Sequence, residues 1–170
     1  MNRPATTEYA PYYQTYIKKV PDGDIIQILA QQMEETRALL KSLPPGKADF
    51  RYAPGKWSIK EVVGHIVDTE RVFAYRALCF SRNDKTPLPS FEQNDYVANA
   101  NFDQRTLEDI TEEFSLVRQA NIILFSSFDE EVEGRKGIAS GVEFTVRAIP
   151  YIIAGHELHH RGILEERYLS

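Results

Sequence analysis

The stretch Trp57-Ser58-Ile59-Lys60-Glu61-Val62-Val63-Gly64-His65-Ile66 decides how this chain folds. Ser58 and Glu61 have the spacing of a capping box, in which the serine hydroxyl accepts from the Glu61 amide and the carboxylate reaches back to the serine amide. Apolar residues then follow at helical spacing as far as Phe80. We therefore predict a helix over 59–81, with His65 in its first half.

Three further segments carry apolar residues at alternating steps of three and four, and we predict helices over 23–43, 107–128 and 145–168. Asp22 or Asp24 can cap the first of them. Pro150 lies near the start of the last one and marks either a kink or its true beginning. The stripe of 107–128 has one polar member, Asn121, which we interpret as a hydrogen-bonded residue that fixes the register of the helices.

The connections between these helices are long in two places. Residues 83–104 contain prolines and polar turn residues, and a loop of this length is often functional. Residues 129–143 predict a loop or a short hairpin. We therefore predict an all-α, up-down four-helix bundle as a single domain over 22–170. The tyrosine-rich residues 1–21 form an N-terminal arm that packs against the helices or serves as a pocket lid or dimer contact.

Composition narrows the class of protein. The chain has 170 residues and a net charge of −5, so it lacks the broad positive field that attracts nucleic acid or anionic membranes. It has no apolar run of transmembrane length and no signal-peptide core, so we expect a cytoplasmic protein. The one cysteine, Cys79, lies in an apolar stretch and is interpreted as a buried hydrophobic residue.

The four histidines are the most informative polar residues. His156 and His160 are four residues apart, so on a helix they stack on one face and can share a metal ion. His65 on another helix would complete three ligands with open coordination positions, as in catalytic sites. The alternative is core or surface histidines that bond to their neighbours. His159 lies about 100° around the helix from His160, which places it behind the site or on the surface.

Neighbouring residues extend this interpretation. Asp68, three residues after His65, could orient its imidazole or act as a base, whereas Glu61 is already used by the capping box. We expect Glu157 to face water. Gly64 and Gly155 each precede a histidine, and close helix–helix approach at the site is one reason to keep glycine in a helix despite its cost, with chance as the alternative for either one.

Two segments resemble a known family. Residues 57–70 (WSIKEVVGHIVDTE) resemble the second-helix motif of the DinB/YfiT-like metalloenzyme superfamily, and residues 155–162 (GHELHHRG) resemble its C-terminal helix motif. The resemblance implies a four-helix bundle, often dimeric, which binds zinc, nickel or another divalent ion through His65, His156 and His160. Relatives often carry Gln where this chain has Ile163, which indicates a different branch.

The resemblance also implies an activity. Better-characterised relatives are transferases and isomerases that use bacillithiol, mycothiol or glutathione, and others are assigned as metal-dependent hydrolases. Our preferred hypothesis is a metal-dependent transferase that activates a small thiol, which attacks an electrophile near the 83–104 loop, with Arg76 and Tyr96 as pocket contacts. The alternatives are a hydrolase that activates water and a non-catalytic, metal-stabilised stress or binding protein. Nucleic acid and membranes are not expected partners, and a homodimer is expected only from the resemblance.

Overall fold

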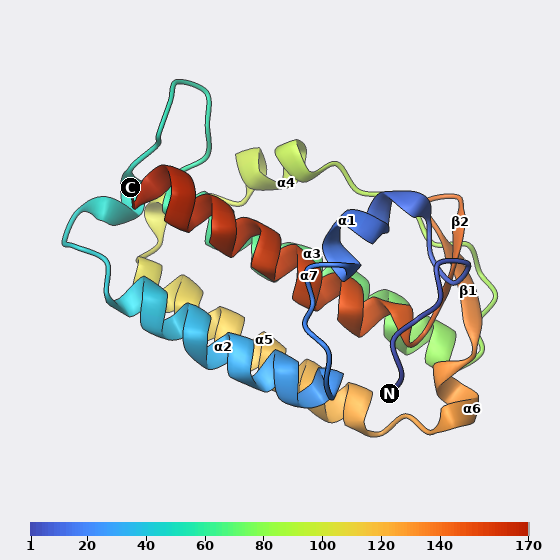
Figure 1. The fold of residues 1–170 in the computed structure, drawn as a ribbon. Coiled ribbons are helices and arrows are strands. Elements are labelled where there is room, and N and C mark those ends of the chain that lie inside the picture. Colours follow the sequence, from blue (N-terminus) through green and yellow to red (C-terminus); the bar gives the residue numbers. More distant parts are fainter. Residues whose placement is uncertain (170) are drawn as a thin grey trace.

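Four long helices form the body of the molecule in the computed structural model, which describes residues 1–169 (Figure 1). They are α2 (Ile25–Lys41), α3 (Ile59–Ser81), α5 (Leu107–Ser126) and α7 (Ala148–Ile163). α2 and α3 each pack against both α5 and α7, so these two consecutive helices lie on opposite corners of the bundle. The predicted four-helix bundle is therefore confirmed.

The start of α3 follows directly from the sequence. Ser58 Oγ accepts from the Glu61 amide, and Glu61 Oε2 accepts from the Ser58 amide at 2.6 Å, so both halves of the predicted capping box are present. The observed helix begins at Ile59 and ends at Ser81, as predicted. Asp24 caps α2 by accepting from the Ile26 amide, which settles the choice between Asp22 and Asp24.

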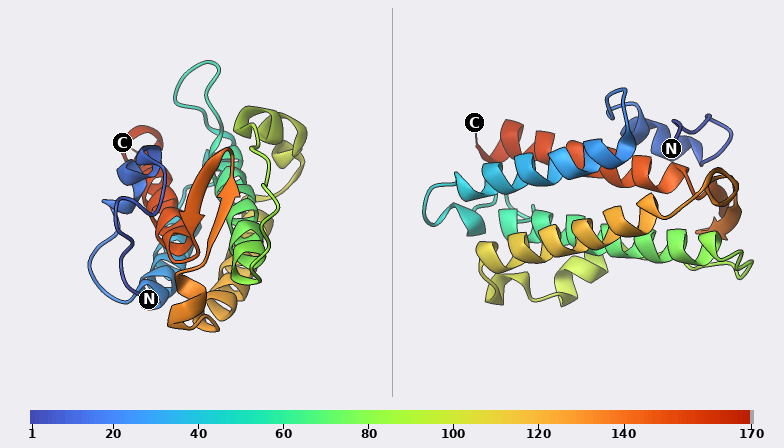
Figure 2. Two further views of the ribbon diagram at one scale, coloured as in Figure 1. Left: turned by 90° about the vertical axis from the view of Figure 1, so that its right-hand side faces the viewer. Right: turned by 90° about the horizontal axis from the view of Figure 1, so that it is seen from below.

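The connection after α3 runs back along the length of the bundle, so α3 and α5 point in the same direction and the helices do not alternate up and down as predicted (Figures 1 and 2). This connection contains the short helix α4 (Gln93–Asn99) and the 3-10 turn η3 (Phe102–Gln104), where the sequence predicted only a loop. A strand-like contact joins it to the hairpin, because Leu88 pairs with Ala139. The connection therefore covers one side of α3 along much of its length.

The predicted hairpin between the last two long helices is present. After α6 (Glu130–Glu133), β1 (Lys136–Ala139) pairs antiparallel with β2 (Val142–Thr145). The last helix, α7, begins at Ala148, so Pro150 occupies its first turn, where no intrahelical bond to its nitrogen is needed. The chain then continues into a π-helical turn, η4 (Leu164–Tyr168).

The N-terminal arm packs against α7 and contains two short turns, η1 (Pro11–Tyr13) and α1 (Gln14–Ile17). Arg3 donates to the carbonyl oxygens of Ile17 and Val20 at 3.0 and 2.7 Å, and Glu8 pairs with Arg147. The arm is therefore fixed at both ends. It covers the outer side of α7, and all residues from Ala148 to Glu157 are buried.

A buried ion cluster ties the four helices together. Arg118 on α5, which is fully buried, donates to both carboxylate oxygens of Glu70 at 2.8 Å and lies 2.7 Å from Glu157. Asn121 donates to Glu70, which confirms its predicted role, and Thr36 on α2 donates to Glu157. The expectation that Glu157 faces water is wrong: it is 1% exposed, because its carboxylate is paired in the core.

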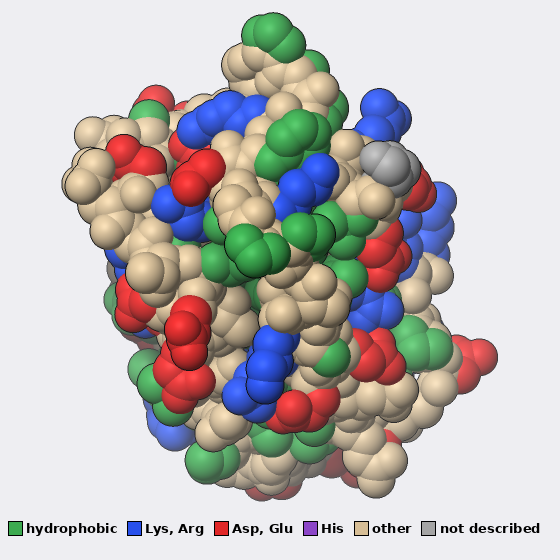
Figure 3. Space-filling view, turned by 90° about the vertical axis from the view of Figure 1, so that its left-hand side faces the viewer, with side chains coloured by type: hydrophobic (Ala, Val, Ile, Leu, Met, Phe, Trp, Pro, Cys, Tyr) green, Lys and Arg blue, Asp and Glu red, His purple; other side chains and the backbone are tan. Residues whose placement is uncertain are grey.

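The outer surface carries charges of both signs. Figure 3 shows the end of the bundle that contains the C-terminus, where acidic and basic side chains are interspersed and no histidine is visible. No helix among residues 1–169 is long and apolar enough to span a membrane. Cys79 is buried and free, as its apolar surroundings predicted.

Candidate metal centre

Three histidines converge between α3 and α7. His65 comes from α3, and His156 and His160 come from successive turns of α7. His156 Nε2 lies 3.1 Å from His65 Nε2 and 3.1 Å from His160 Nε2. One nitrogen of each ring lies within 4.8 Å of the others, which is close enough for all three to bind a single ion.

Two glycines allow other elements to approach these histidines. A side chain at Gly155 would meet the Tyr16 carbonyl oxygen at 2.2 Å, so α1 can rest on α7 only because this position lacks a Cβ. A Cβ at Gly64 would lie 2.3 Å from the Phe102 ring, so η3 can lie against α3 only because this position is glycine. The close approach expected beside both histidines is therefore confirmed.

Burial keeps the three imidazoles neutral. Burial first, and neighbouring histidines second, lower the pKa of His65 to about 4 and that of His160 to about 3. The pKa of His156 is also lowered well below its ordinary value, first by burial and then by His160 and His65. Neutral imidazoles are the form that binds a metal ion.

The converging nitrogens do not satisfy one another. A proton on one Nε2 can serve only one of the two short contacts that His156 makes, so at least one buried lone pair faces another nitrogen. A divalent cation would accept all three lone pairs at once. The three-histidine donor set, with borderline-soft nitrogen ligands and room for further ligands, suits zinc, nickel or a similar ion.

The second nitrogen of His65 has a hydroxyl partner. Thr69 Oγ1, one turn later on α3, lies 3.4 Å from His65 Nδ1 and can accept its proton, which directs Nε2 toward the other histidines. Asp68, predicted as an orienting or basic carboxylate, has Arg71, Glu113 and Arg105 as its charged neighbours. Its pKa is raised, mainly by burial. A catalytic role for Asp68 stays a prediction.

Two hollows of about 230 Å³ each reach the histidines. The first, the tyrosine hollow, contains His65 and His156 and is lined by Tyr12, Tyr13, Tyr16, Thr69, Phe73, Phe91, Glu92 and Gln93. The second, the tryptophan hollow, contains His160 and is lined by Tyr52, Gly55, Lys56, Trp57, Val62, Asn94, Ile163 and Tyr168. Consecutive residues at the start of α4, Gln93 and Asn94, belong to different hollows.

The fourth histidine lies outside the cluster. His159 is half-buried, and its ring packs against Tyr16 and His160 with ring centroids 5.4 and 5.1 Å apart. Tyr16 also contacts His156 and shares a hydrogen bond of 3.1 Å with Tyr12. Burial raises the pKa of the Tyr16 phenol, which therefore stays protonated and able to donate.

Family membership follows from the whole pattern rather than from the histidines alone. The model of the DinB superfamily matches residues 28–164. This range includes all three histidines and the four long helices, apart from the start of α2. The chain belongs to the DinB superfamily. A search of curated proteins found no significant match.

Solved structures share the DinB fold at low sequence identity. YfiT from Bacillus subtilis, described as a probable metal-dependent hydrolase with an unusual four-helix bundle topology, has a TM-score of 0.75 at 14% identity, covering 84% of this chain and 82% of YfiT. The DinB-like protein YjoA from Bacillus subtilis has a TM-score of 0.60 at 20% identity, with coverages of 86% and 90%. These likenesses establish the fold.

A third structure of this fold belongs to a larger protein. The mycothiol-dependent maleylpyruvate isomerase has a TM-score of 0.68 at 9% identity. The match covers 85% of this chain but only 61% of the isomerase. The fold is thus shared by proteins described as acting in different reactions.

Sequence reasoning missed several residues that build the site. Thr69 and Trp57 were inside the quoted motif, and Trp57 packs on His65 with ring centroids 4.9 Å apart. Thr69 was detectable, since it follows His65 by four residues and shares its helix face. The tyrosine-rich arm was predicted to pack on the helices or to cover a pocket, but only the fold shows that Tyr12 and Tyr16 lie beside the histidines.

Proposed function

We propose that this protein is a metal-dependent transferase that joins a small thiol to an electrophile. The observation that carries the proposal is a three-histidine cluster reached from two separate hollows. A divalent cation held by these histidines would supply Lewis acidity, which lowers the pKa of a bound thiol or water. The remaining argument concerns what the chain itself contributes.

The chain provides no thiol of its own at the site. Cys79, its one cysteine, is buried among the core residues and lines neither hollow. A sulfur nucleophile would therefore come from a separate molecule. Two hollows on different sides of one cluster allow two organic molecules to meet there, and this favours a transferase over a reaction with a single organic substrate.

The walls of the hollows suit organic ligands. Aromatic side chains line both hollows, and hydroxyl groups in the tyrosine hollow can donate to an oxygen of the electrophile. Tyr16 is the best placed of these donors, because it packs on His156 and keeps its proton. Asp68 is retained as a proposed proton acceptor outside both hollows.

A hydrolase is the second candidate. It is supported by the same cluster, because three histidines with open positions also serve water-activating sites. A metal-stabilised protein without catalysis is the third candidate. The cytoplasmic location and the homodimer remain predictions.

The first test is the metal content. Protein purified without a tag or a nickel column should contain about one divalent ion per chain by elemental analysis. His160→Ala should lose most of it, whereas His159→Ala, the matched control on the neighbouring position, should keep it. Full occupancy in the His160→Ala variant would remove His160 as a ligand.

The second test separates the candidate reactions. Metal-loaded protein is incubated with electrophiles in the presence or absence of bacillithiol, mycothiol and glutathione, and separately with esters and amides. The transferase requires turnover that depends on both the thiol and the metal. Turnover of esters or amides without thiol would support the hydrolase, and stabilisation by metal without turnover would support the non-catalytic protein.

A further inference from the structure

Arg76 on α3 is a buried cation without a counter-charge. It is 2% exposed, and its Nη2 donates to the Pro89 carbonyl oxygen and to Ser140 Oγ, both at 3.0 Å. Its guanidinium lies over the Phe73 ring at 4.9 Å, and the Tyr13 hydroxyl is a further neutral neighbour. Among residues 1–169, no carboxylate forms an ion pair with Arg76.

An unpaired buried charge is costly. Removing a cation from water is unfavourable by several kcal/mol unless a counter-charge or several hydrogen bonds replace the lost hydration. The pKa of Arg76 is accordingly lowered, chiefly by burial. In the same chain Arg118 meets two carboxylates, which shows how the fold neutralises a buried arginine when the charge has only a structural role.

The surroundings of Arg76 are built to hold it in place. Ser140 has a φ of 54°, an uncommon value for a residue other than glycine, and it sits in the turn between β1 and β2. This conformation accompanies the bond from Arg76 to its side chain. The hairpin, α3 and the 88–91 segment thus fix the guanidinium from three sides.

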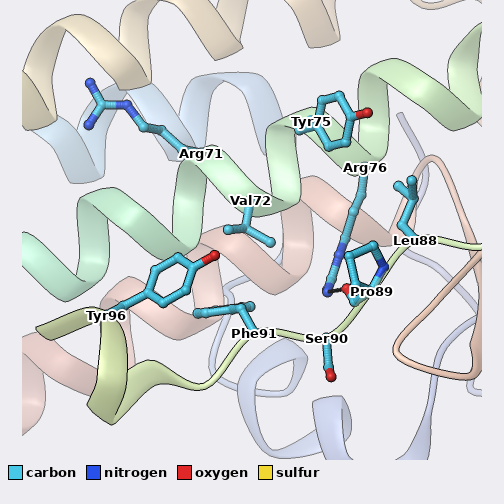
Figure 4. Close-up of a pocket in the computed structure, with 9 residues that line it drawn as sticks. All are labelled: Arg71, Val72, Tyr75, Arg76, Leu88, Pro89, Ser90, Phe91 and Tyr96. Atoms are coloured by element: carbon cyan, nitrogen blue, oxygen red, sulfur yellow. Dashed lines mark hydrogen bonds between the residues drawn. The ribbon is translucent and has the colours of Figure 1, made fainter. Parts of the chain in front are cut away.

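A pocket of about 290 Å³ lies beside this guanidinium (Figure 4). Its wall is mostly apolar or aromatic and consists of Arg71, Val72, Tyr75, Arg76, Leu88, Pro89, Ser90, Phe91 and Tyr96. Figure 4 shows the Tyr96 hydroxyl directed toward Val72, whereas the Arg71 side chain extends away from Phe91 and Pro89. Arg71 also pairs with Glu113, so Arg76 is the cation left for a ligand. Arg76 and Tyr96, which we expected to contact the electrophile at the metal, line this pocket and neither of the hollows that contain histidines.

We propose that this pocket binds a small aromatic carboxylate, with its charged group against Arg76 and its ring against Phe91 and Tyr96. The buried cation calls for a monoanion, and the aromatic wall favours a ring over a hydrated inorganic ion. Phe91 also lines the tyrosine hollow, and the Arg76 neighbours Tyr13 and Phe73 do so too. The carboxylate site therefore adjoins the metal centre but does not depend on it.

The test is a calorimetric titration of the full-length protein, with and without metal, using benzoate, benzyl alcohol and inorganic phosphate as probes. Benzoate should bind saturably in both forms and at least about tenfold more tightly than benzyl alcohol, because a charge-assisted hydrogen bond contributes this much. Equal affinity for the acid and the alcohol, or tighter binding of phosphate than of benzoate, would overturn the proposal.

Variants locate the site. Arg76→Gln should abolish the preference for benzoate over benzyl alcohol. Arg71→Gln, the matched control on the same pocket, should leave benzoate affinity within about twofold, since its charge is already paired. Val72→Phe keeps the cation but fills the pocket, so it should weaken benzoate binding at least about tenfold. This variant tests the site even if Arg76→Gln does not fold. Loss of binding in Arg71→Gln, or retention in Val72→Phe, would contradict the assignment.

Discussion

Two clusters of buried polar groups join α3 and α7, and they differ in how complete they are. In the ion cluster, Arg118 meets Glu70 and Glu157, and the second oxygen of Glu157 accepts from Thr36. In the histidine cluster, three ring nitrogens face one another at 3.1 Å for each of two pairs, an arrangement in which the ring protons cannot satisfy every lone pair. The ion cluster is buried, as are His65 and His156, whereas His160 is half-buried.

The difference fits a structural role for the ion cluster and the proposed metal-binding role for the histidine cluster. A buried polar group persists only when its partners replace water, and in the ion cluster those partners belong to the chain. In the histidine cluster the ring nitrogens do not satisfy one another, which is the arrangement expected of a metal-binding site. Disrupting each cluster in turn should therefore have different consequences, and the predictions below are ordered by the size of the expected effect.

Removing the central cation of the ion cluster should have the largest effect. Arg118→Met leaves two carboxylates buried without a counter-charge, and such a change costs about 3–5 kcal/mol in the free energy of unfolding. Urea denaturation measures this loss. As a control, Arg71→Met removes the exposed partner of Glu113 and should cost less than about 1 kcal/mol. If Arg118→Met lowers the free energy of unfolding by less than about 1 kcal/mol, the ion cluster is not essential to the stability of the bundle.

Acid should destabilise the metal-free protein through the histidine cluster. The pKa of His65 is about 4 in the folded chain and that of His160 about 3, against an ordinary value of 6.5. Between these values the unfolded chain binds more protons, so stability is full above pH 6.5 and falls as the pH is lowered. The loss is on the order of 3 kcal/mol for His65 alone.

The measurement is urea denaturation of chelator-treated protein between pH 7.5 and 4. The variant His65→Gln should have a shallower dependence on pH, because one of the perturbed groups is gone. If the wild-type curve is flat over this range, the folded imidazoles are not held neutral.

Metal should stabilise the protein through the same cluster. At a free concentration one hundred times the dissociation constant, one bound ion adds about 2.7 kcal/mol to the free energy of unfolding. Zinc titration followed by thermal unfolding should show this gain in the wild type and in Arg71→Met, and should not show it in His156→Ala. Equal gains in all three proteins would place the ion elsewhere.

The local rules of sequence predicted the helices well. The capping box fixed the start of α3 at Ile59, and the step of four between His156 and His160 put both rings on one face of α7. The prediction that His65 joins these two rings required only that α3 and α7 be neighbours, which is common in a bundle. These features depend on residues close together in the chain.

Features that depend on the third dimension were missed. Glu157 was assigned to water because a bundle helix usually has one polar face, but the arm covers the outer side of α7 and its first ten residues are all buried. Arg118 follows Phe114 by four residues, so its place on the buried stripe could have been found. Its partners could not, because Glu70 lies 48 residues before Arg118 and Glu157 lies 39 residues after it.

The smallest effects should separate two glycines on α7 that receive the same substitution. Gly162→Ala meets no atom within 4 Å, so it should raise the free energy of unfolding by about 0.4–1 kcal/mol through reduced freedom of the unfolded chain. Gly155→Ala places a methyl group against the backbone of Tyr16, and the overpacking should cost about 1–3 kcal/mol. Because α1 must move to relieve this contact, Gly155→Ala should also displace Tyr16 from His156, which increased proteolysis of residues 1–21 would reveal. If both variants gain stability equally, the arm does not pack on α7 at Gly155. The tyrosines of the arm would then not line the tyrosine hollow.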